Sequence, residues 1–376
     1  MIMKGVSIVV KNYVKSVTSP KKFIIGQNLL ASLNDYMRNF GDHAYIICDE
    51  FILERAEQEA GQSIKAGRNK AVFVKFNYEI TKDEINQHRE ASRQHGANII
   101  VGIGGGKTLD TAKATAYYEK LPVVIFPTIA STDAPCTALA VIYKKDGSFD
   151  EYLFLPSNPD VVLADTGILS AAPSRFFAAG IGDALATYFE ARACYQAFGD
   201  NLVLMKPSLT GLGLSRMCYD SLLENAVKAK KAVDQGITTR AVEATIEATI
   251  YLSGVGAESG GLAAAHAIHN GMTAVESLHK AQHGEKVTFG LLAQLVLENA
   301  PKEELETVIQ LVKDVGLPLT LKDLGVKEFK EEEWRKVAAD ACAEGDTMGN
   351  MPFPVTPDDV YNAIVAANAI AESYHD

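Results

Sequence analysis

The sequence predicts an α/β fold for the N-terminal part of the chain and an all-helical fold for the C-terminal part. In the first half, short apolar runs rich in β-branched residues alternate with polar segments of helical periodicity. After about residue 170, alanine-rich and leucine-rich helical windows dominate, and β-rich runs nearly vanish. A third observation is a run of three glycines between a buried strand and a helix, which is typical of a Rossmann-like, nucleotide-binding parallel sheet.

In the first half, helical segments connect the predicted strands. Residues 51–67 and 81–97 follow the first two strands, and residues 107–120 follow the glycines that end the third. Repeated units of this length allow the crossover connections of a parallel sheet with helices on both faces. The predicted strands span residues 44–49, 71–76, 98–103, 122–127 and 161–165, and an Asp-Gly pair predicts a hairpin over 140–155.

Length and composition limit the class of protein. At 376 residues the chain can form two substantial cores, and we place the two domains at residues 1–170 and 171–376. The net charge of −11 argues against nucleic acid as a partner. The five cysteines lack CxxC spacing, which is typical of reduced thiols in a cytoplasmic protein. No segment reaches the roughly 18 apolar residues of a membrane span, and residues 1–16 predict a short N-terminal extension.

Asp183, His266 and His283 are candidate metal ligands, because each lies in a small-residue segment of helical character. Two neutral imidazoles and a carboxylate form a ligand set that suits Zn²⁺ or Fe²⁺. Three protein ligands leave a coordination position open for a substrate oxygen, which is the mark of a catalytic metal site. Any long chain holds an aspartate and two histidines, so these residues alone do not indicate a metal site. The glycine turn upstream is a second, independent signal of an enzyme.

The glycine turn lies in VGIGGGKTLD, where Gly104, Gly105 and Gly106 separate a strand from a helix. Consecutive glycines let the backbone approach a pyrophosphate closely, and the helix N-terminus offers free N–H groups. The segment matches neither the P-loop nor the GxGxxG fingerprint, so a tight turn without a ligand is the alternative. Asp49 ends the first strand. Its carboxylate could accept a hydrogen bond from a ribose 2′-OH and repel a 2′-phosphate, or it could cap the next helix.

Six blocks of sequence resemble the glycerol dehydrogenases, a branch of the superfamily of iron-containing alcohol dehydrogenases and dehydroquinate synthases. The blocks are GIGGGKTLDTAKA, PTIASTDAPCTALAVIY, NPDVVLADT, AAGIGDALATYFEARA, SGGLAAAHAIHNG and HGEKVTFG. With SPKKFIIGQN, which begins at residue 19, the resemblance covers nearly the whole chain. It implies an N-terminal NAD-binding domain, a helical metal-binding domain, and an active site in the cleft between them.

The resemblance also implies roles for individual residues. Asp183, His266 and His283 would bind Zn²⁺, and Asp133 in ASTDAP would face the substrate hydroxyls. Asp49 would contact the adenine ribose. The residues implied to surround the pyrophosphate or to line the cofactor and its nicotinamide are Gly104, Gly105, Gly106, Lys107, Thr128, Ser131, Thr137, Leu139, Val141 and Tyr143.

Four positions qualify the resemblance. Iron-dependent members carry a further histidine one helical turn after the aspartate, where this chain has Thr187, which favours the zinc type. His269 lies on the same helix face as His266 and could substitute, but we expect it to pack or to support the ligands. Ala257 stands where relatives have a phenylalanine that lines the substrate pocket, so the pocket could be wider. Gly349 stands where they often have a histidine, without a functional account.

The activity implied by the resemblance is NAD-dependent and zinc-dependent oxidation of glycerol and related vicinal diols at C2 to dihydroxyacetone. Hydride would pass from a metal-bound alkoxide to C4 of the nicotinamide. The resemblance also implies a homo-oligomer. One alternative is a glycerol-1-phosphate dehydrogenase or another polyol or aldehyde oxidoreductase of the superfamily, although Asp133 would repel a substrate phosphate. The other is a degenerate relative that binds metal or nucleotide without catalysis.

Overall fold

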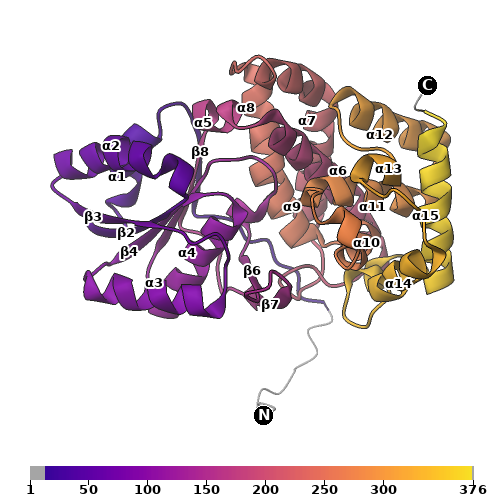
Figure 1. The fold of residues 1–376 in the computed structure, drawn as a ribbon, viewed down its shortest axis with the longest axis horizontal. Coiled ribbons are helices and arrows are strands. Elements are labelled where there is room, and N and C mark those ends of the chain that lie inside the picture. Colours follow the sequence, from indigo (N-terminus) through magenta and orange to yellow (C-terminus); the bar gives the residue numbers. More distant parts are fainter. Residues whose placement is uncertain (1–12, 375–376) are drawn as a thin grey trace, which may run out of the picture.

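The structure is a computed structural model that describes residues 13–374 of the chain. Figure 1 shows two halves side by side: an α/β half of N-terminal residues (indigo and purple) and a helical half of C-terminal residues (orange and yellow). The predicted fold class is therefore confirmed. Of the predicted N-terminal extension, residues 1–12 lie outside the described residues.

The α/β half is built on a six-stranded parallel sheet. In chain order its strands are β1 (Lys22–Gly26), β2 (His43–Cys48), β3 (Lys70–Lys75), β4 (Ile99–Gly104), β5 (Val123–Pro127) and β8 (Val161–Asp165). Across the sheet they lie in the order β1-β8-β5-β4-β2-β3. Five of them match the predicted strands to within one residue at each end, whereas β1 was not predicted. It is a five-residue strand, KFIIG, in which only three successive residues are large and apolar, so the sequence signal is weak.

Helices cover both faces of this sheet, as the predicted units require. Residues Ile99, Val101 and Ile103 of β4 pack in one buried cluster, whereas Ile100 packs in another with Leu109. This alternation is the two-residue period of a strand that is buried on both sides. In Figure 1 the first two helices lie above the sheet and the next two lie below it. These elements are η1 (Leu30–Ser32), α1 (Leu33–Met37), α2 (Glu50–Ala66), α3 (Lys82–Gln94) and α4 (Gly106–Glu119).

A separate two-stranded hairpin follows β5, as predicted. It consists of β6 (Leu139–Tyr143) and β7 (Phe149–Phe154), which pair antiparallel, and it is preceded by the short 3₁₀ helix η2 (Ala134–Cys136). Gly147 in the connecting turn has a φ of 82°, a conformation that glycine adopts without strain. The segment from β5 to β7 thus leaves the sheet and leads toward the helical half.

The helical half is organised around one long central helix, α6, which contacts α7, α9 and α11. Its elements are α5 (Thr166–Ala171), α6 (Ser174–Ala197), α7 (Leu209–Val233), α8 (Arg240–Ile246), the π-helix η3 (Glu247–Leu252), α9 (Ser253–Gly260), α10 (Ala264–Met272), η4 (Glu276–Leu278), α11 (His283–Leu297), α12 (Lys302–Asp314), α13 (Leu321–Leu324), α14 (Glu331–Ala341), η5 (Thr347–Asn350) and α15 (Pro357–Glu372). Within residues 13–374, none of the helices has both the length and the apolar character needed to cross a bilayer.

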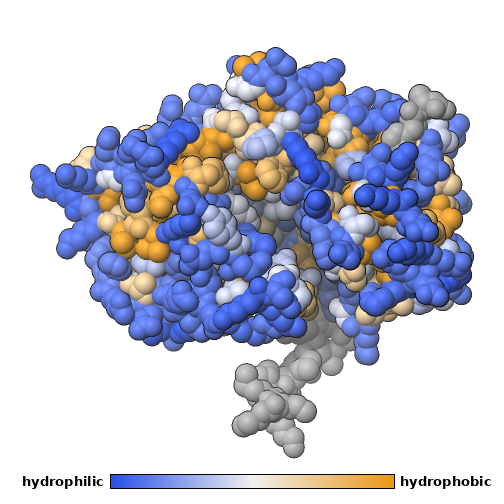
Figure 2. Space-filling model, in the orientation of Figure 1, coloured by the Kyte–Doolittle hydropathy of each residue, from blue (hydrophilic) through white to orange (hydrophobic). Residues whose placement is uncertain are grey.

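The hydrophobic core continues from the sheet into the helical half. One cluster of buried side chains contains Ile125 of β5 together with Leu185 of α6. The N-terminal segment also reaches the helical half, because the Thr18 hydroxyl donates a hydrogen bond to the Glu258 carboxylate of α9. The boundary that we placed at residue 170 falls within α5, directly after the last strand of the sheet. Figure 2 shows that mostly hydrophilic residues cover this face, with a recess between the two halves.

Candidate active site

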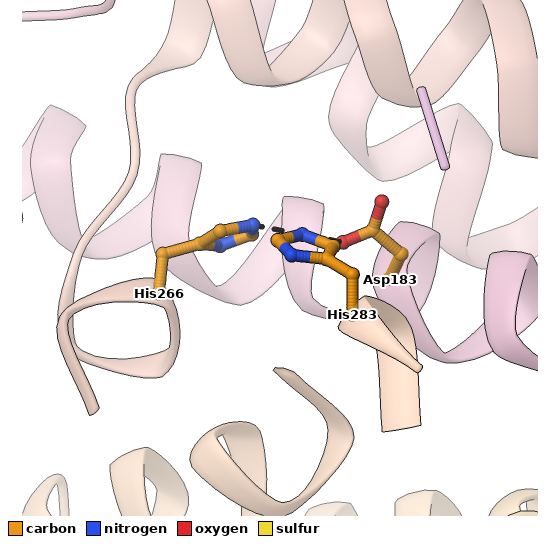
Figure 3. Close-up of side chains that lie close together, drawn as sticks. All are labelled: Asp183, His266 and His283. Carbon is orange, nitrogen blue, oxygen red and sulfur yellow. Dashed lines mark ion pairs between the residues drawn. The ribbon is translucent and has the colours of Figure 1, made fainter. Parts of the chain in front are cut away.

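Three helices of the helical half bring the predicted metal ligands together. Asp183 lies in the middle of α6, His266 lies in α10, and His283 is the first residue of α11. The Asp183 Oδ1 atom lies 3.1 Å from Nε2 of His283 and 3.6 Å from Nε2 of His266. The three candidate ligand atoms all lie within 4.8 Å of one another (Figure 3). Among residues 13–374 this is the group of acidic, histidine and cysteine side chains whose geometry could hold a metal ion.

The environment of this site favours a positive charge at its centre. Asp183 is buried, and no described residue makes a hydrogen bond to its Oδ1 atom, the oxygen that faces both imidazoles. Burial opposes the charged form of Asp183, but His283 and His266 hold the pKa of this carboxyl below its usual range. The side chain of His283 is 37% exposed, compared with 3% for Asp183, so the site opens on the side of His283. One buried carboxylate oxygen and two imidazole nitrogens therefore meet at one point that a divalent cation fits.

Glu190 orients the His266 imidazole, and it was not among the predicted site residues. Its Oε2 atom lies 2.5 Å from Nδ1 of His266, and its Oε1 atom accepts hydrogen bonds of 2.9 Å from the N–H groups of His266 and Ala263. Burial opposes a charge on His266, but Glu190 and Asp183 raise the pKa of the imidazole well above its ordinary value. A hydrogen bond from Nδ1–H to Glu190 leaves the Nε2 lone pair directed at the metal position.

Glu285 fixes the first turn of α11, which carries His283. Its Oε2 atom accepts a hydrogen bond of 2.8 Å from the N–H of Gln282, in the manner of a capping box. The same carboxylate accepts two hydrogen bonds of 2.7 Å from the Arg175 guanidinium at the start of α6. Because Glu285 is buried, this bidentate pair ties the N-terminus of α11 to α6, and with it the backbone of two candidate ligands.

Thr187 and His269 lie beside the three ligands without joining them. Thr187 is buried one helical turn after Asp183, and its Oγ1 atom lies 2.8 Å from Oγ of Ser253. The His269 ring packs edge-on against His283, with 4.3 Å between ring centroids. Burial, and then the nearby basic side chains of His283 and Lys286, lower the pKa of His269 well below its ordinary value. This position matches the packing or supporting role that we expected for His269.

Asp133 lies close to the three ligands, although it comes from the α/β half. It directly precedes η2, and its Oδ2 atom accepts a hydrogen bond of 3.0 Å from the Ser253 hydroxyl. Burial and the Asp183 carboxylate raise the pKa of Asp133 to about 6. The Ser253 hydroxyl contacts both Asp133 and Thr187, and Thr187 follows Asp183 by one helical turn, so the two carboxylates belong to one neighbourhood.

The glycine turn connects β4 to α4, as predicted. A Cβ atom at Gly104 would lie 2.5 Å from Oδ2 of Asp49, whereas one at Gly106 would meet no heavy atom within 4 Å. Asp49 accepts a hydrogen bond of 2.8 Å from the N–H of Gly105 and another from the Thr108 hydroxyl. The carboxylate thus faces the glycine turn, and it makes no side-chain cap to α2. The N-terminus of α4 is therefore open beside Gly106.

Lys107 lies at the same turn, and its ammonium is held by a protein partner. Its Nζ atom lies 2.7 Å from Oε2 of Glu79 and 5.1 Å from the centroid of the Tyr143 ring. The glycine turn therefore lies beside the β6–β7 hairpin, which carries Tyr143. The other residues implied to line the cofactor follow β5 along one stretch of chain: Thr128, Ser131, Thr137, Leu139 and Val141.

A buried ion pair holds that stretch in place, and it too was absent from the predicted site. The Lys113 ammonium lies 2.7 Å from Oδ1 of Asp110 and donates hydrogen bonds to the carbonyl oxygens of Ala134 and Leu139. The Asp110 Oδ2 atom accepts a hydrogen bond of 3.0 Å from the N–H of Val141. Both charged side chains are almost completely buried. Helix α4 thus begins at the glycine turn. One and two turns later, its Asp110 and Lys113 hold the segment that the resemblance places against the nicotinamide.

The two unusual positions lie in different places. Ala257 is buried in α9, one helical turn after Ser253. Gly349 lies in η5, where a Cβ atom would meet no heavy atom within 4 Å, so a side chain would fit there.

Comparisons with known proteins agree with this architecture. The sequence profile described as "Iron-containing alcohol dehydrogenase" matches residues 20–166. A glycerol dehydrogenase of Citrobacter freundii is 47% identical over 360 residues, which cover 96% of this chain and 99% of that protein. The chain belongs to the glycerol dehydrogenase branch of the iron-containing alcohol dehydrogenase family. The crystal structure of glycerol dehydrogenase from Schizosaccharomyces pombe matches with a TM-score of 0.91 and 33% identity, covering 96% of this chain and 92% of that one.

One relative is named for a different activity. A glycolaldehyde reductase of Halobacterium salinarum is 40% identical over 358 residues, which cover 95% of this chain and 98% of that protein. Both directions of alcohol–carbonyl chemistry are therefore represented among close relatives of this chain.

Proposed function

We propose that this protein is an NAD-dependent, zinc-dependent dehydrogenase that oxidises glycerol and related vicinal diols at C2 to dihydroxyacetone. The observation that carries the proposal is the convergence of Asp183, His266 and His283 at one point, with the Asp133 carboxylate beside them. The identity to glycerol dehydrogenases over nearly the full chain supports the choice of substrate. The glycine turn and the stretch after β5 supply the cofactor side of the same cleft.

Zinc is the metal we propose, because one carboxylate and two imidazoles are a three-ligand set that leaves a position for substrate. Thr187 stands one turn after Asp183, and its hydroxyl is already hydrogen-bonded to Ser253, so it supplies no fourth ligand. When bound, the zinc ion would acidify a substrate hydroxyl, and NAD⁺ would accept the hydride from the carbinol carbon.

The protein's own groups bind, orient and shield the substrate. Asp133 can accept a hydrogen bond from the hydroxyl that is not oxidised, which selects diols over simple alcohols. Glu190 orients the His266 imidazole, and Glu285 holds the backbone turn that carries His283, before any ligand arrives. The buried Asp110–Lys113 pair fixes the segment that we propose to lie against the nicotinamide. Asp49 and Lys107 lie at the glycine turn, where we propose that they contact the ribose and the pyrophosphate.

Reduction of a small hydroxyaldehyde is the second candidate function, because the Halobacterium salinarum relative carries that name. It uses the same site and cofactor in the reverse direction. A phosphorylated substrate fits less well, because Asp133 and Asp183 both lie where a substrate phosphate would need cations. The free thiols of all five cysteines are typical of a reducing compartment, and we propose a cytoplasmic enzyme. We also propose that it acts as a homo-oligomer, as the family resemblance implies.

The test is formation of NADH from NAD⁺ and glycerol at alkaline pH, before chelation, after chelation, and after Zn²⁺ is restored. We expect activity that chelation abolishes and zinc returns. NADP⁺ in place of NAD⁺ tests the choice of cofactor, and glycolaldehyde with NADH tests the reductive direction. 2-Propanol, which has one hydroxyl, tests the need for a second hydroxyl. Protein that binds NADH but turns over no alcohol or carbonyl would contradict the proposal and identify a degenerate relative.

A further inference from the structure

A chain of two hydroxyl groups leads from α6 through α9 to the Asp133 carboxylate. The Thr187 Oγ1 atom lies 2.8 Å from the Ser253 Oγ atom, and Ser253 Oγ lies 3.0 Å from Oδ2 of Asp133. Thr187 is 1% exposed and Ser253 is 0% exposed, so water does not compete for either hydroxyl. The chain therefore crosses from the helical half to the α/β half within the protein interior.

The chemistry of these groups fixes the direction of the hydrogen bonds. An ionised carboxylate only accepts, so the single hydroxyl proton of Ser253 is donated to Asp133. Ser253 then has only lone pairs left for its contact with Thr187, which must donate to it. Burial disfavours the charge on Asp133, and a donated hydrogen bond offsets part of that cost. Thr187 thus acts on Asp133 through Ser253, by keeping the serine hydroxyl turned toward the carboxylate.

The local backbone explains how Ser253 reaches this position. The π-helix η3 ends at Leu252, directly before Ser253. Its wider turns hold more residues than those of an α-helix, so the side chains that follow point in a different direction around the helix axis. Gly254 comes next, where a Cβ atom would lie 3.0 Å from the Asp133 carbonyl oxygen and 2.9 Å from Cβ of Cys136. A π turn and a glycine at the contact let α9 approach the Asp133 segment closely enough for the serine to bond.

We propose that Ser253 and Thr187 are positioning residues, which hold the Asp133 carboxylate in the orientation that receives the second hydroxyl of the substrate. This inference rests on the proposed function. It gives a role to Thr187, the position at which the resemblance to iron-dependent relatives would require a histidine. In this protein Thr187 supports substrate recognition, whereas the metal is left with three protein ligands.

The test compares variants that differ by a single hydroxyl. Thr187→Val has nearly the same shape but cannot donate, whereas Thr187→Ser keeps the donor. We expect Thr187→Val to raise the KM for glycerol about five- to tenfold with a smaller change in kcat, and Thr187→Ser to stay within about twofold of wild type. Ser253→Ala should raise the KM at least as much. The KM for NAD⁺ and the zinc content should not change. Thr245→Val is the matched control, because that buried hydroxyl bonds only to the Ala241 carbonyl among the described residues.

A double-mutant cycle separates positioning from simple structural support. In the Asp133→Asn background, Thr187→Val should have little further effect on the KM for glycerol, because the carboxylate it acts through is gone. The same cycle is measured by thermal unfolding of the zinc-loaded protein, which needs no activity. If the wild-type enzyme oxidises glycerol but the effects of Thr187→Val and Asp133→Asn are additive in both measurements, the inference is overturned and the proposed function remains intact. Wild-type protein without activity on any diol would instead overturn the proposed function, and coupling in the unfolding cycle would then show only a structural chain.

Discussion

In the helical half, the two candidate histidine ligands are supported by carboxylates that leave Nε2 of each ring free of them. Glu190 holds the far nitrogen of His266, and Glu285 holds the turn that carries His283. At the glycine turn the opposite holds, because the groups that we propose to meet the cofactor are bonded to the protein itself. Lys107 pairs with Glu79, and Asp49 accepts the N–H of Gly105. The metal site is thus organised before binding, whereas the cofactor side must exchange protein contacts for ligand contacts. We expect removal of a metal ligand to abolish zinc binding, and changes of the side chains at the glycine turn to alter NAD⁺ binding only slightly.

The strongest test of this comparison removes a ligand. His266→Ala or Asp183→Asn should abolish zinc binding and reduce glycerol oxidation by about a thousandfold or more, because either change leaves only two of the three ligand atoms that converge here. Zinc content by atomic absorption and NADH formation are measured on the same preparation. His266→Ala protein that carries zinc and turns over at nearly the wild-type rate would contradict the ligand assignment.

The next effect concerns stability on the cofactor side. Lys113→Met removes the cation that pairs with buried Asp110 and holds the carbonyl oxygens of Ala134 and Leu139. Loss of one partner of a buried pair typically costs about 3–5 kcal/mol. The free energy of unfolding, measured by urea denaturation, should fall by about that amount. Lys82→Met is the control, because the Lys82 ammonium that pairs with Asp150 lies in solvent, so its loss should change the stability little. Equal losses in the two variants would show that the buried pair is not an anchor.

A third prediction tests whether Glu190 controls the metal through His266. In Glu190→Gln the amide NH₂ can replace the oxygen that accepts from Nδ1–H, which favours the tautomer with a proton on Nε2. That proton occupies the metal position, so zinc affinity should fall about 10- to 100-fold. Competition with a chromophoric chelator measures the affinity. Glu304→Gln serves as the control, because this carboxylate pairs with Arg192 away from the site. Unchanged zinc affinity in Glu190→Gln would leave Glu190 with a packing role only.

The sequence predicted the ligands more completely than the residues that support them. Asp183, His266 and His283 stood out because their side chains are chemically rare in alanine-rich and glycine-rich segments. The five predicted strands, four inner strands and the edge strand β3, were likewise marked by apolar runs. Glu190 was missed although a signal existed: it follows Asp183 by two helical turns in the same segment, and an acidic residue on that face must be buried.

Other parts of the site could not be read from the sequence. The contact of Ser253 with Asp133 spans 120 residues and depends on a π turn, for which the sequence offers no periodic signal. Lys113 looks like an ordinary lysine in a helix, and only the folded chain shows that the segment from Ala134 to Leu139 encloses its ammonium group. Such roles arise from how distant segments pack, so residue type and local spacing do not reveal them.

The smallest expected effects lie at the glycine turn, and they sharpen the contrast with the metal site. Lys107→Met should raise the KM for NAD⁺ only about tenfold, because the lysine must first leave Glu79 before it can bind a phosphate. For the same reason Glu79→Gln, which weakens that competing pair, should lower the KM for NAD⁺ about twofold. Lys145→Met, which breaks a fully exposed pair with Asp83, should change neither constant. If Lys107→Met left the KM for NAD⁺ unchanged, the lysine would serve Glu79 alone, and the turn would bind the pyrophosphate through backbone N–H groups only.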